Sequence, residues 1–267
     1  TIVFKFSGGT VILNVSVEVD AVELEGTFNV MPAIEPAVFY QDQGFNLTTP
    51  DSRIYSSDQL FPGEWFEYTV LNGLDPENLG KAKYVAIQLY PLQYLPSTGE
   101  ITRARSITVT VEYQGSRSPT RQQEKLVIIT SPDLEDAAND LKAHRESLGI
   151  TTSVVLTDWI YANYPGVDNQ EKIRNYIIDA YNNDDITHVL ILGDADQVPV
   201  RMVYINDGYD TYVESDLYYA DLDYTWNTDG DEYWGEIEDD QPLDGIPDVY
   251  VSRLPASTLA EAQDMVD

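Results

Sequence analysis

The segment best suited to binding a cation is 227–240, NTDGDEYWGEIEDD, which holds seven carboxylates and no Lys or Arg. Asn227, Asp229 and Asp231 stand at alternate positions, followed by Tyr233, with its backbone carbonyl, and by Glu236 or Glu238. Calcium takes about six to eight oxygen ligands, and loops that bind it supply oxygens at alternate positions. The spacing therefore predicts a calcium loop, although the glycines do not fit an EF-hand. A solvated acidic loop without a metal is the alternative.

A second set of oxygen donors surrounds an apolar run near the end of the sequence. Asp244 and Asp248 flank Ile246 just before that run, and Asp194 follows another apolar run. The three carboxylates and the Ile246 carbonyl would form an oxygen cage for a hard cation such as calcium. Spacing alone leaves the alternative open that these acids simply precede or follow strands.

The residues needed for nucleophilic catalysis are scarce. The sequence has no Cys, and its two histidines are His144, in a helical pattern, and His188, at the start of an apolar run. Both positions are more typical of structural than of catalytic histidines. Ser215-Asp216 has no histidine placed by the sequence to activate the serine. The 267 residues therefore contain no complete catalytic machinery, and no GxSxG, P-loop or GxGxxG motif.

The charge of the chain is strongly negative and unevenly distributed. The formal net charge is −31, and residues 126–267 carry 31 acids against 6 bases. Residues 207–248 hold 15 acids and no base. Such a surface disfavours nucleic acids and anionic lipids, because contacts to phosphate need Lys and Arg. No apolar run of about 18 residues predicts a membrane span.

Residues 1–115 show the period-two alternation of β-strands. The segments 10–26, 64–74, 83–96 and 106–113 are rich in β-branched and aromatic residues and are separated by turns with Gly, Pro and Asn. The pattern predicts an antiparallel all-β domain, most simply a β-sandwich. Residues 116–125 follow as a polar, locally basic linker.

Residues 126–267 change to an alternation of strands and helices. Buried strands are expected at 125–130, 150–157, 187–199 and 248–255, with helices at 131–149 and 168–183 and a partial helix at the end. Ser131, Pro132 and Gly149 are expected to bound the first helix, and Asp168 and Glu171 to cap the second. The predicted fold class is α+β multidomain, with the β-sandwich followed by a doubly wound α/β parallel sheet.

Four segments together resemble the gingipain-like cysteine peptidases of peptidase family C25. They are VLILGDADQVPVR, SDLYYADLD and IPDVYVSRLPAS in the second half, and YPLQYLPSTGEITRARSITVTVEY in the first half, which is similar to the family prodomain. The resemblance implies a prodomain and the first subdomain of a caspase-like catalytic domain. It places the catalytic Cys, the catalytic His and most of the substrate pocket in a second subdomain beyond residue 267.

The resemblance also implies a calcium site on Asp194, Asp244, the Ile246 carbonyl and Asp248. Asp248 stands where the family more usually has Glu, whose longer side chain reaches farther. The stretch from Asn227 to Glu236 is similar to an elaboration of the same loop, which would hold a second ion.

Zymogens of the family are matured by cleavage between the prodomain and the catalytic domain. The resemblance therefore implies that the linker contains the cleavage site. Arg121, Arg117 and Lys125 are candidate residues before the cut bond, and Arg121 is preferred because Pro119 lies close after Arg117. The expected protein is secreted, with a signal peptide outside this sequence, and acts on proteins or peptides in its full-length form. The 267 residues alone are expected to be inactive. The alternatives are a calcium-dependent extracellular adhesion module and, less favoured, a nucleotide- or flavin-binding domain.

Overall fold

The computed structural model describes residues 1–31, 51–78, 80–115, 123–205, 211–236, 240, 243 and 245–267. These residues form two compact units. The first contains residues 1–4, 11–70 and 85–114, and the second contains residues 5–10, 71–84 and 115–267. The second unit thus includes two short pieces of the first half of the chain, residues 5–10 and 71–84.

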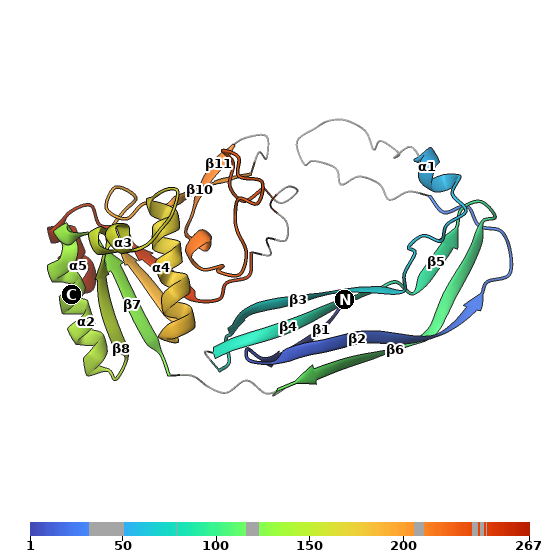
Figure 1. The fold of residues 1–267 in the computed structure, drawn as a ribbon, viewed down its shortest axis with the longest axis horizontal. Helices are drawn as coiled ribbons and strands as arrows, with labels where there is room; N and C mark the ends of the chain where they lie inside the picture. Colours follow the sequence, from blue (N-terminus) through green and yellow to red (C-terminus); the bar gives the residue numbers. More distant parts are fainter. Residues whose placement is uncertain are drawn as a thin grey trace. The chain divides into compact units, whose positions relative to one another are not determined.

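The first half of the chain is built from antiparallel strands, as the alternating pattern predicts (Figure 1). One three-stranded sheet has the order β1-β4-β3 and a second has the order β2-β6-β5, in which β6 pairs antiparallel with both neighbours. A four-residue helix, α1, spans Ser52–Tyr55. The strands are β1 Ile2–Ser7, β2 Val11–Glu23, β3 Phe66–Asp75, β4 Gly80–Leu89, β5 Leu92–Leu95 and β6 Glu100–Gln114.

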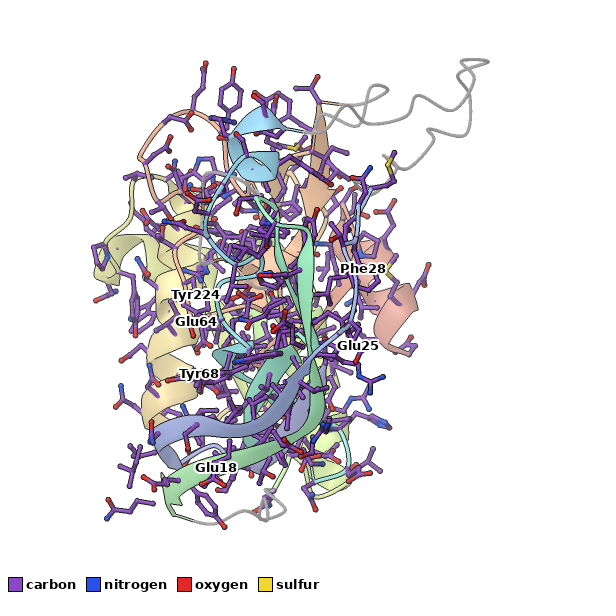
Figure 2. The ribbon with its side chains drawn as sticks, turned by 90° about the vertical axis from the view of Figure 1, so that its right-hand side faces the viewer. Glu18, Glu25, Phe28, Glu64, Tyr68 and Tyr224 are labelled. Atoms are coloured by element: carbon purple, nitrogen blue, oxygen red, sulfur yellow. The ribbon has the colours of Figure 1, made fainter. Side chains whose placement is uncertain are left out.

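Polar residues alternate with apolar ones along β2, and the polar ones lie on an exposed face of the β2-β6-β5 sheet. Val15 of β2 is 5% exposed, whereas Glu18 on the same strand and Glu25 just after it are exposed (Figure 2). The turn between β5 and β6 contains Gly99 at a φ of +73°. A Cβ there would lie 2.6 Å from the Thr27 side chain, so a residue with a side chain would clash as well as strain the backbone.

The second half contains the predicted parallel sheet. Its order is β12-β9-β7-β8, and all three pairings are parallel. The expected strand–helix alternation and the fold class are confirmed. The strands are β7 Lys125–Thr130, β8 Thr151–Leu156, β9 His188–Leu192 and β12 Tyr250–Leu254.

Helices cover both faces of this sheet because the strands are apolar on both sides. Val127 and Ile129 of β7 pack in a cluster with Ile173 and Ile177 of α4, whereas Ile128 packs with residues of α2 and α5. Alternate residues of one strand therefore face opposite layers, which is the doubly wound arrangement (Figure 1). The helices are α2 Glu135–Ser147, α3 Thr157–Asn163, α4 Asn169–Asn183 and α5 Leu259–Val266.

The first predicted helix differs from expectation at both ends. Pro132–Leu134 form a 3-10 turn, η1, before α2, and the Ser131 side chain contacts Gln197 instead of capping the helix. The helix α2 ends at Ser147, and the next residue, Leu148, is 60% exposed. The helix α3 and the hairpin of β10 (Arg201–Tyr204) and β11 (Tyr212–Ser215) were not predicted.

Candidate functional site

Asp194 lies at the carboxyl end of the parallel sheet, directly after β9. Its Oδ1 accepts hydrogen bonds from the backbone N–H of Asp196 at 3.1 Å and of Gln197 at 3.3 Å, and its Oδ2 accepts one from the Ser257 hydroxyl. The Ser257 hydrogen bond is the main cause that lowers the pKa of Asp194. The carboxylate therefore organises the turn after β9 in its ionised form.

Arg253 of β12 fixes the same end of the sheet. Its Nε and Nη2 each lie 2.7 Å from an Asp216 carboxylate oxygen, and Nη1 donates to the carbonyls of Gly193 at 2.9 Å and Val198 at 2.8 Å. Asp216 opens the 3-10 helix η2, Asp216–Tyr219. One guanidinium thus joins β12, the turn after β9 and the segment after β11. Sequence reasoning considered Asp216 only as a neighbour of Ser215.

Two open pockets lie at this carboxyl edge. One, of about 420 Å³, is lined by four acids, Asp194, Asp196, Glu214 and Asp216, together with Arg253. The other, of about 480 Å³, lies beyond the ends of β7, β8 and β9, and its lining includes Ser131, Thr157 and Gln197. Ligands of open α/β sheets bind at this edge, where the strand order reverses. Both linings are dominated by polar and acidic groups.

Asp248 lies at the opposite end of the sheet from Asp194. In the β12–β9 register Tyr250 pairs with His188 and Leu254 with Leu192. Asp248 precedes Tyr250, whereas Asp194 follows Leu192, so at least four residue steps, roughly 13 Å, separate them along the strands. One ion cannot bind both carboxylates. The predicted cage is wrong in this respect, because the start of one parallel strand lies beside the start of its neighbour.

The surroundings of Asp248 nevertheless gather other oxygens. Asp248 is fully buried, and its Oδ2 accepts a hydrogen bond from the backbone N–H of Leu222 at 2.8 Å. The Tyr181 hydroxyl lies 3.5 Å from Oδ1. Asp221 is also fully buried, and its Oδ2 accepts from the backbone N–H of Gly245 at 3.0 Å. Two buried carboxylates therefore flank the turn that contains Ile246.

This turn is the part of the predicted cage that fits a metal. Asp221 and Asp248 supply buried carboxylates, and Asp244 lies outside the described residues. Ile246 lies in the sequence between Asp248 and Gly245, the backbone partner of Asp221. Within the described ranges no three acidic or histidine side chains come together as metal ligands. The described oxygen donors at this turn are therefore two carboxylates and a carbonyl, which suit a hard, oxygen-binding ion, and Asp194 is not among them. Asp221 is a site residue that sequence reasoning missed.

A buried arginine organises the segment that carries Asp221. Arg174 of α4 is 7% exposed, and its guanidinium donates to the carbonyls of Tyr218, Asp221 and Tyr224 at 2.5–3.2 Å. Burial lowers the pKa of Arg174, while Tyr218, Asp221 and Asp248 act in the opposite direction. The helix α4 thus holds residues 218–224 in place through a single side chain.

The acidic loop is held by its own hydrogen bonds in the described residues. Asn227 Oδ1 accepts from the backbone of Gly230 at 2.7 Å, and its Nδ2 donates to the Asp231 carbonyl at 2.8 Å. Asp229 Oδ1 accepts from the Asp231 backbone, and Asp231 Oδ1 accepts from the Tyr233 backbone. The carboxylates of Asp229 and Asp231, two ligands of the predicted second calcium site, are thus bonded to nearby backbone groups.

Asp240 is the carboxylate around which this loop folds. It is 1% exposed, and it accepts hydrogen bonds from the backbone N–H groups of Thr228 at 2.5 Å, Gly235 at 2.9 Å and Glu236 at 3.0 Å. One carboxylate thus joins the backbone of Thr228 to that of Gly235 and Glu236. The sequence gives no signal that distinguishes Asp240 from the acids around it.

The remaining candidate residues have structural surroundings or lie outside the described residues. His144 is exposed on α2, and His188 stacks on Tyr250 with ring centroids 4.8 Å apart. The Ser215 hydroxyl accepts a hydrogen bond from the Leu217 backbone and so caps η2. The candidate cleavage residues Arg117 and Arg121 lie outside the described residues.

Antiparallel sheets followed by a doubly wound parallel sheet define a two-part α/β protein, and comparisons with known proteins give its family. A family model described as peptidase family C25 matches residues 119–267, and a model described as its propeptide, Propeptide_C25, matches residues 13–132. The chain belongs to peptidase family C25, with a propeptide region before a peptidase region. The two matches overlap at residues 119–132, across part of the predicted linker.

Three solved structures are similar to parts of the chain at 18% identity. "Structure of Protease" has a TM-score of 0.40 and covers 54% of this chain and 27% of its own. The complex of Porphyromonas gingivalis RgpB pro- and mature domains has a TM-score of 0.37 with the same coverage. Dimeric latent PorU from Porphyromonas gingivalis has a TM-score of 0.41 and covers 74% and 20%. The chain thus spans about a quarter of these chains or less. A search of curated proteins found no match.

Proposed function

We propose that this chain is the propeptide and the first α/β part of a secreted cysteine endopeptidase. The observation that supports this most is the order of the two family matches, a propeptide followed by a peptidase region that contains a parallel sheet. The sequence contains no Cys, so the nucleophile would come from outside these 267 residues. Among the described residues, no helix is long and apolar enough to cross a membrane.

The proposed reaction is hydrolysis of a peptide bond by a Cys/His pair. The thiolate attacks the scissile carbonyl, backbone amides stabilise the oxyanion, and His gives a proton to the leaving amine. Water then hydrolyses the thioester and releases the second product. The residues of this chain would form the scaffold beside that centre: Arg253 fixes the turn after β9, and Arg174 fixes residues 218–224.

Activity measurements on two proteins test this proposal. The 267-residue chain should not hydrolyse peptides in the presence of a reducing thiol. The full-length gene product, after maturation, should hydrolyse them and lose activity with a thiol-alkylating reagent. Activity in the short chain alone would contradict the proposal. A full-length protein without activity and without a Cys/His pair would favour the calcium-dependent adhesion module, a reading consistent with the absence of Cys here.

We further propose that calcium binds at the turn of residues 245–248, with Asp221, the Ile246 carbonyl and Asp248 as ligands and with Asp244 as a further candidate from the sequence alone. Burying two carboxylates in one turn is costly, and a divalent ion offsets the repulsion between them. The ion would neutralise the buried carboxylates and fix the turn before β12. In this arrangement Asp221 replaces Asp194 of the set predicted from the sequence.

The calcium proposal is tested by thermal unfolding and by terbium luminescence. An ion that binds only the folded state at a concentration of 100 times its Kd raises the free energy of unfolding by about 2.7 kcal/mol. We expect excess EDTA to lower the Tm of the wild type and of Asp231→Asn equally, and to have little effect on Asp248→Asn or Asp221→Asn. Terbium luminescence sensitised by nearby aromatic residues should be lost in the same two variants. Equal terbium binding by all four proteins would rule out this turn.

Maturation of the proposed enzyme would require a cut in the linker. Arg121 is the preferred residue before the cut and Arg117 the second choice, and both remain sequence-based proposals. Mass spectrometry of the mature protein secreted by its natural host identifies the new amino terminus. We expect it at residue 122 in the wild type and elsewhere in Arg121→Gln. An unchanged terminus in that variant would exclude Arg121, and recovery of all the protein inside cells would argue against secretion.

A further inference from the structure

A hairpin from the propeptide region forms part of the peptidase unit. Residues 71–84 contain the end of β3, the beginning of β4 and the turn between them. They lie within the propeptide match, yet they belong to the same compact unit as residues 115–267. Contacts inside this unit therefore describe how a propeptide hairpin binds peptidase residues.

The tip of the hairpin contacts the turn before β12. The backbone N–H of Leu74 donates to the Pro247 carbonyl at 3.1 Å. A Cβ on Gly73 would lie 2.8 Å from Cγ2 of Ile246, so the glycine allows the two backbones to approach closely. This is the same turn that carries the proposed calcium ligands.

Polar side chains extend the contact to the segment fixed by Arg174. Asn72 Nδ2 donates to Asp223 Oδ2 at 2.9 Å, and Lys83 Nζ donates to Asn72 Oδ1 at 2.7 Å. Lys83 thus orients the Asn72 amide so that its NH₂ group faces the carboxylate. The hairpin therefore contacts both segments that flank the buried acids.

Lys81 binds at the C-terminal end of α4, at a position we call the lysine site, formed by Tyr181 and Asp185. Lys81 Nζ donates to the Tyr181 carbonyl at 2.5 Å and lies 3.7 Å from the centroid of the Tyr181 ring. Asp185 Oδ1 lies 3.8 Å from the same nitrogen. A carbonyl near a helix C-terminus, an aromatic face and a carboxylate each attract a cation.

The lysine site is connected to the buried acid of the turn. The Tyr181 hydroxyl lies 3.5 Å from Asp248 Oδ1, so the ring that contacts Lys81 also reaches the turn before β12. The Lys81 side chain is 24% exposed. Burial lowers the pKa of Lys81, while Asp185 and Asp248 oppose that shift. Lys81 is thus a cation of the hairpin that lies beside acidic groups of the peptidase region.

We propose that the lysine site and the turn at 246–248 form a docking surface for residues 71–84. Lys81 is the anchoring residue, and the docked hairpin retains the propeptide after the linker is cut. The hairpin supplies a backbone hydrogen bond and a close glycine contact, and the lysine supplies charge recognition. The proposal depends on the proposed function in one respect only, namely that the linker is cut during maturation. The contacts themselves do not depend on peptidase activity.

The test uses the complete 267-residue chain with a site-specific protease sequence placed within residues 116–122. The chain is folded, cut and analysed by gel filtration over a range of concentrations. The two wild-type fragments should elute together, and those of Lys81→Met should separate at concentrations at least 10-fold higher than in the wild type. Arg105→Gln removes the same charge from an exposed propeptide position on β6 and should behave as the wild type.

Variants of Tyr181 separate the lysine site from general stability. Tyr181→Phe keeps the ring beside Lys81 and should retain the fragment, whereas Tyr181→Ala loses the ring but keeps the backbone carbonyl, and should weaken retention less than Lys81→Met does. The double variant Lys81→Met with Tyr181→Ala should be no weaker than Lys81→Met alone, because the ring contact is already lost with the lysine. In the uncut chains, amide exchange at Leu74 should accelerate in Lys81→Met and remain slow in Arg105→Gln.

Two results would overturn the proposal. One is separation of the wild-type fragments at every concentration, and the other is co-elution of the Lys81→Met and Tyr181→Ala fragments at wild-type concentrations. Far-UV circular dichroism before the cut shows whether each variant is folded. No step measures peptide hydrolysis, so failure of this proposal is distinguishable from failure of the proposed enzyme activity.

Discussion

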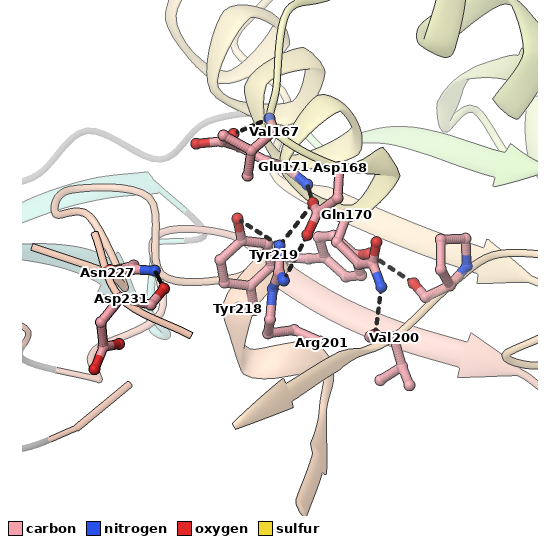
Figure 3. Close-up of polar contacts among 11 residues, drawn as sticks. Val167, Asp168, Gln170, Glu171, Val200, Arg201, Tyr218, Tyr219, Asn227 and Asp231 are labelled. Carbon is pink, nitrogen blue, oxygen red and sulfur yellow. Dashed lines mark hydrogen bonds and ion pairs between the residues drawn. The ribbon is translucent and has the colours of Figure 1, made fainter. Parts of the chain in front are cut away.

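Arg201 and Asp168 form a two-contact ion pair that joins β10 to the first turn of α4. Arg201 Nη1 and Nη2 lie 2.8 Å and 2.9 Å from the two carboxylate oxygens of Asp168 (Figure 3). The Arg201 side chain is 6% exposed, and its guanidinium lies 3.7 Å from the Trp234 ring centroid. The same Asp168 accepts the backbone N–H of Glu171 at 2.8 Å and caps α4. One carboxylate thus performs two tasks.

The two tasks of Asp168 can be separated by substitution. Asp168→Ala removes the cap and the ion pair and should lower the free energy of unfolding by roughly 3–4 kcal/mol, since it leaves Arg201 buried without its carboxylate. Asp168→Ser restores a capping hydroxyl and should recover about 1 kcal/mol. Urea unfolding measures both, with Asp140→Ala on the exposed face of α2 as control. Equal stability of the Ala and Ser variants would contradict the capping role.

Arg253 and Asp216 should be energetically coupled. Arg253→Gln and Asp216→Asn each break the paired contact, and Arg253→Gln also leaves the Gly193 and Val198 carbonyls without their donor. We expect Arg253→Gln to be the more destabilising, and a double-mutant cycle to give a coupling energy of about 1–3 kcal/mol. Unfolding in guanidinium chloride of the four proteins gives this value. Additive effects would show that the pair is not a unit.

The strands of the parallel sheet were easier to predict from the sequence than the candidate metal site, because buried strands have a local apolar pattern. Runs such as residues 126–129 are apolar at every position, because both faces of the strand are covered. The site depends on register and on backbone contacts between distant segments, which have no local pattern. Asp194 and Asp248 appeared to be neighbours only because the direction of their strands was not taken into account.

The site residues that the sequence did not predict were missed for the same reason. Asp221 and Asp240 are distinguished from nearby acids only by burial and by the backbone N–H groups that they accept. The capping role of Asp168 was predicted, because capping has a local signature, and its carboxylate does accept the Glu171 N–H. The Glu171 side chain departs from that signature and accepts the N–H of Val167 instead. The ion pair between Asp168 and Arg201, by contrast, has no local sequence pattern that would predict it.

His188 should make stability depend on pH. Burial lowers the pKa of His188, with Glu124 opposing the shift, so the folded state disfavours the protonated ring. The unfolded histidine takes up a proton near pH 6.5, before the folded one does. The contribution of His188 is therefore complete above pH 6.5 and falls as the pH decreases towards the lowered pKa.

His188→Phe isolates this contribution, because the phenyl ring can still stack on Tyr250. Urea unfolding at pH values from 5 to 8 should show a weaker loss of stability on the acid side for the variant than for the wild type. His144→Phe, at an exposed position, serves as the control and should keep the wild-type profile. Identical profiles for all three proteins would show that His188 titrates alike in the folded and unfolded states.

Asp240 should be essential to the acidic loop but not to calcium binding at the Asp221–Asp248 turn. Asp240→Ala leaves the N–H groups of Thr228, Gly235 and Glu236 without their carboxylate, and each buried unsatisfied group costs about 1–3 kcal/mol. Water will reach part of the opened loop, so we expect a total loss of roughly 2–4 kcal/mol and faster amide exchange at Gly235. Asp229→Ala, at an exposed position of the same loop, should lose far less. The Tm shift caused by EDTA should be unchanged in both variants, since their carboxylates do not belong to the proposed ligand set. A smaller EDTA shift in both variants than in the wild type would instead place calcium in the acidic loop.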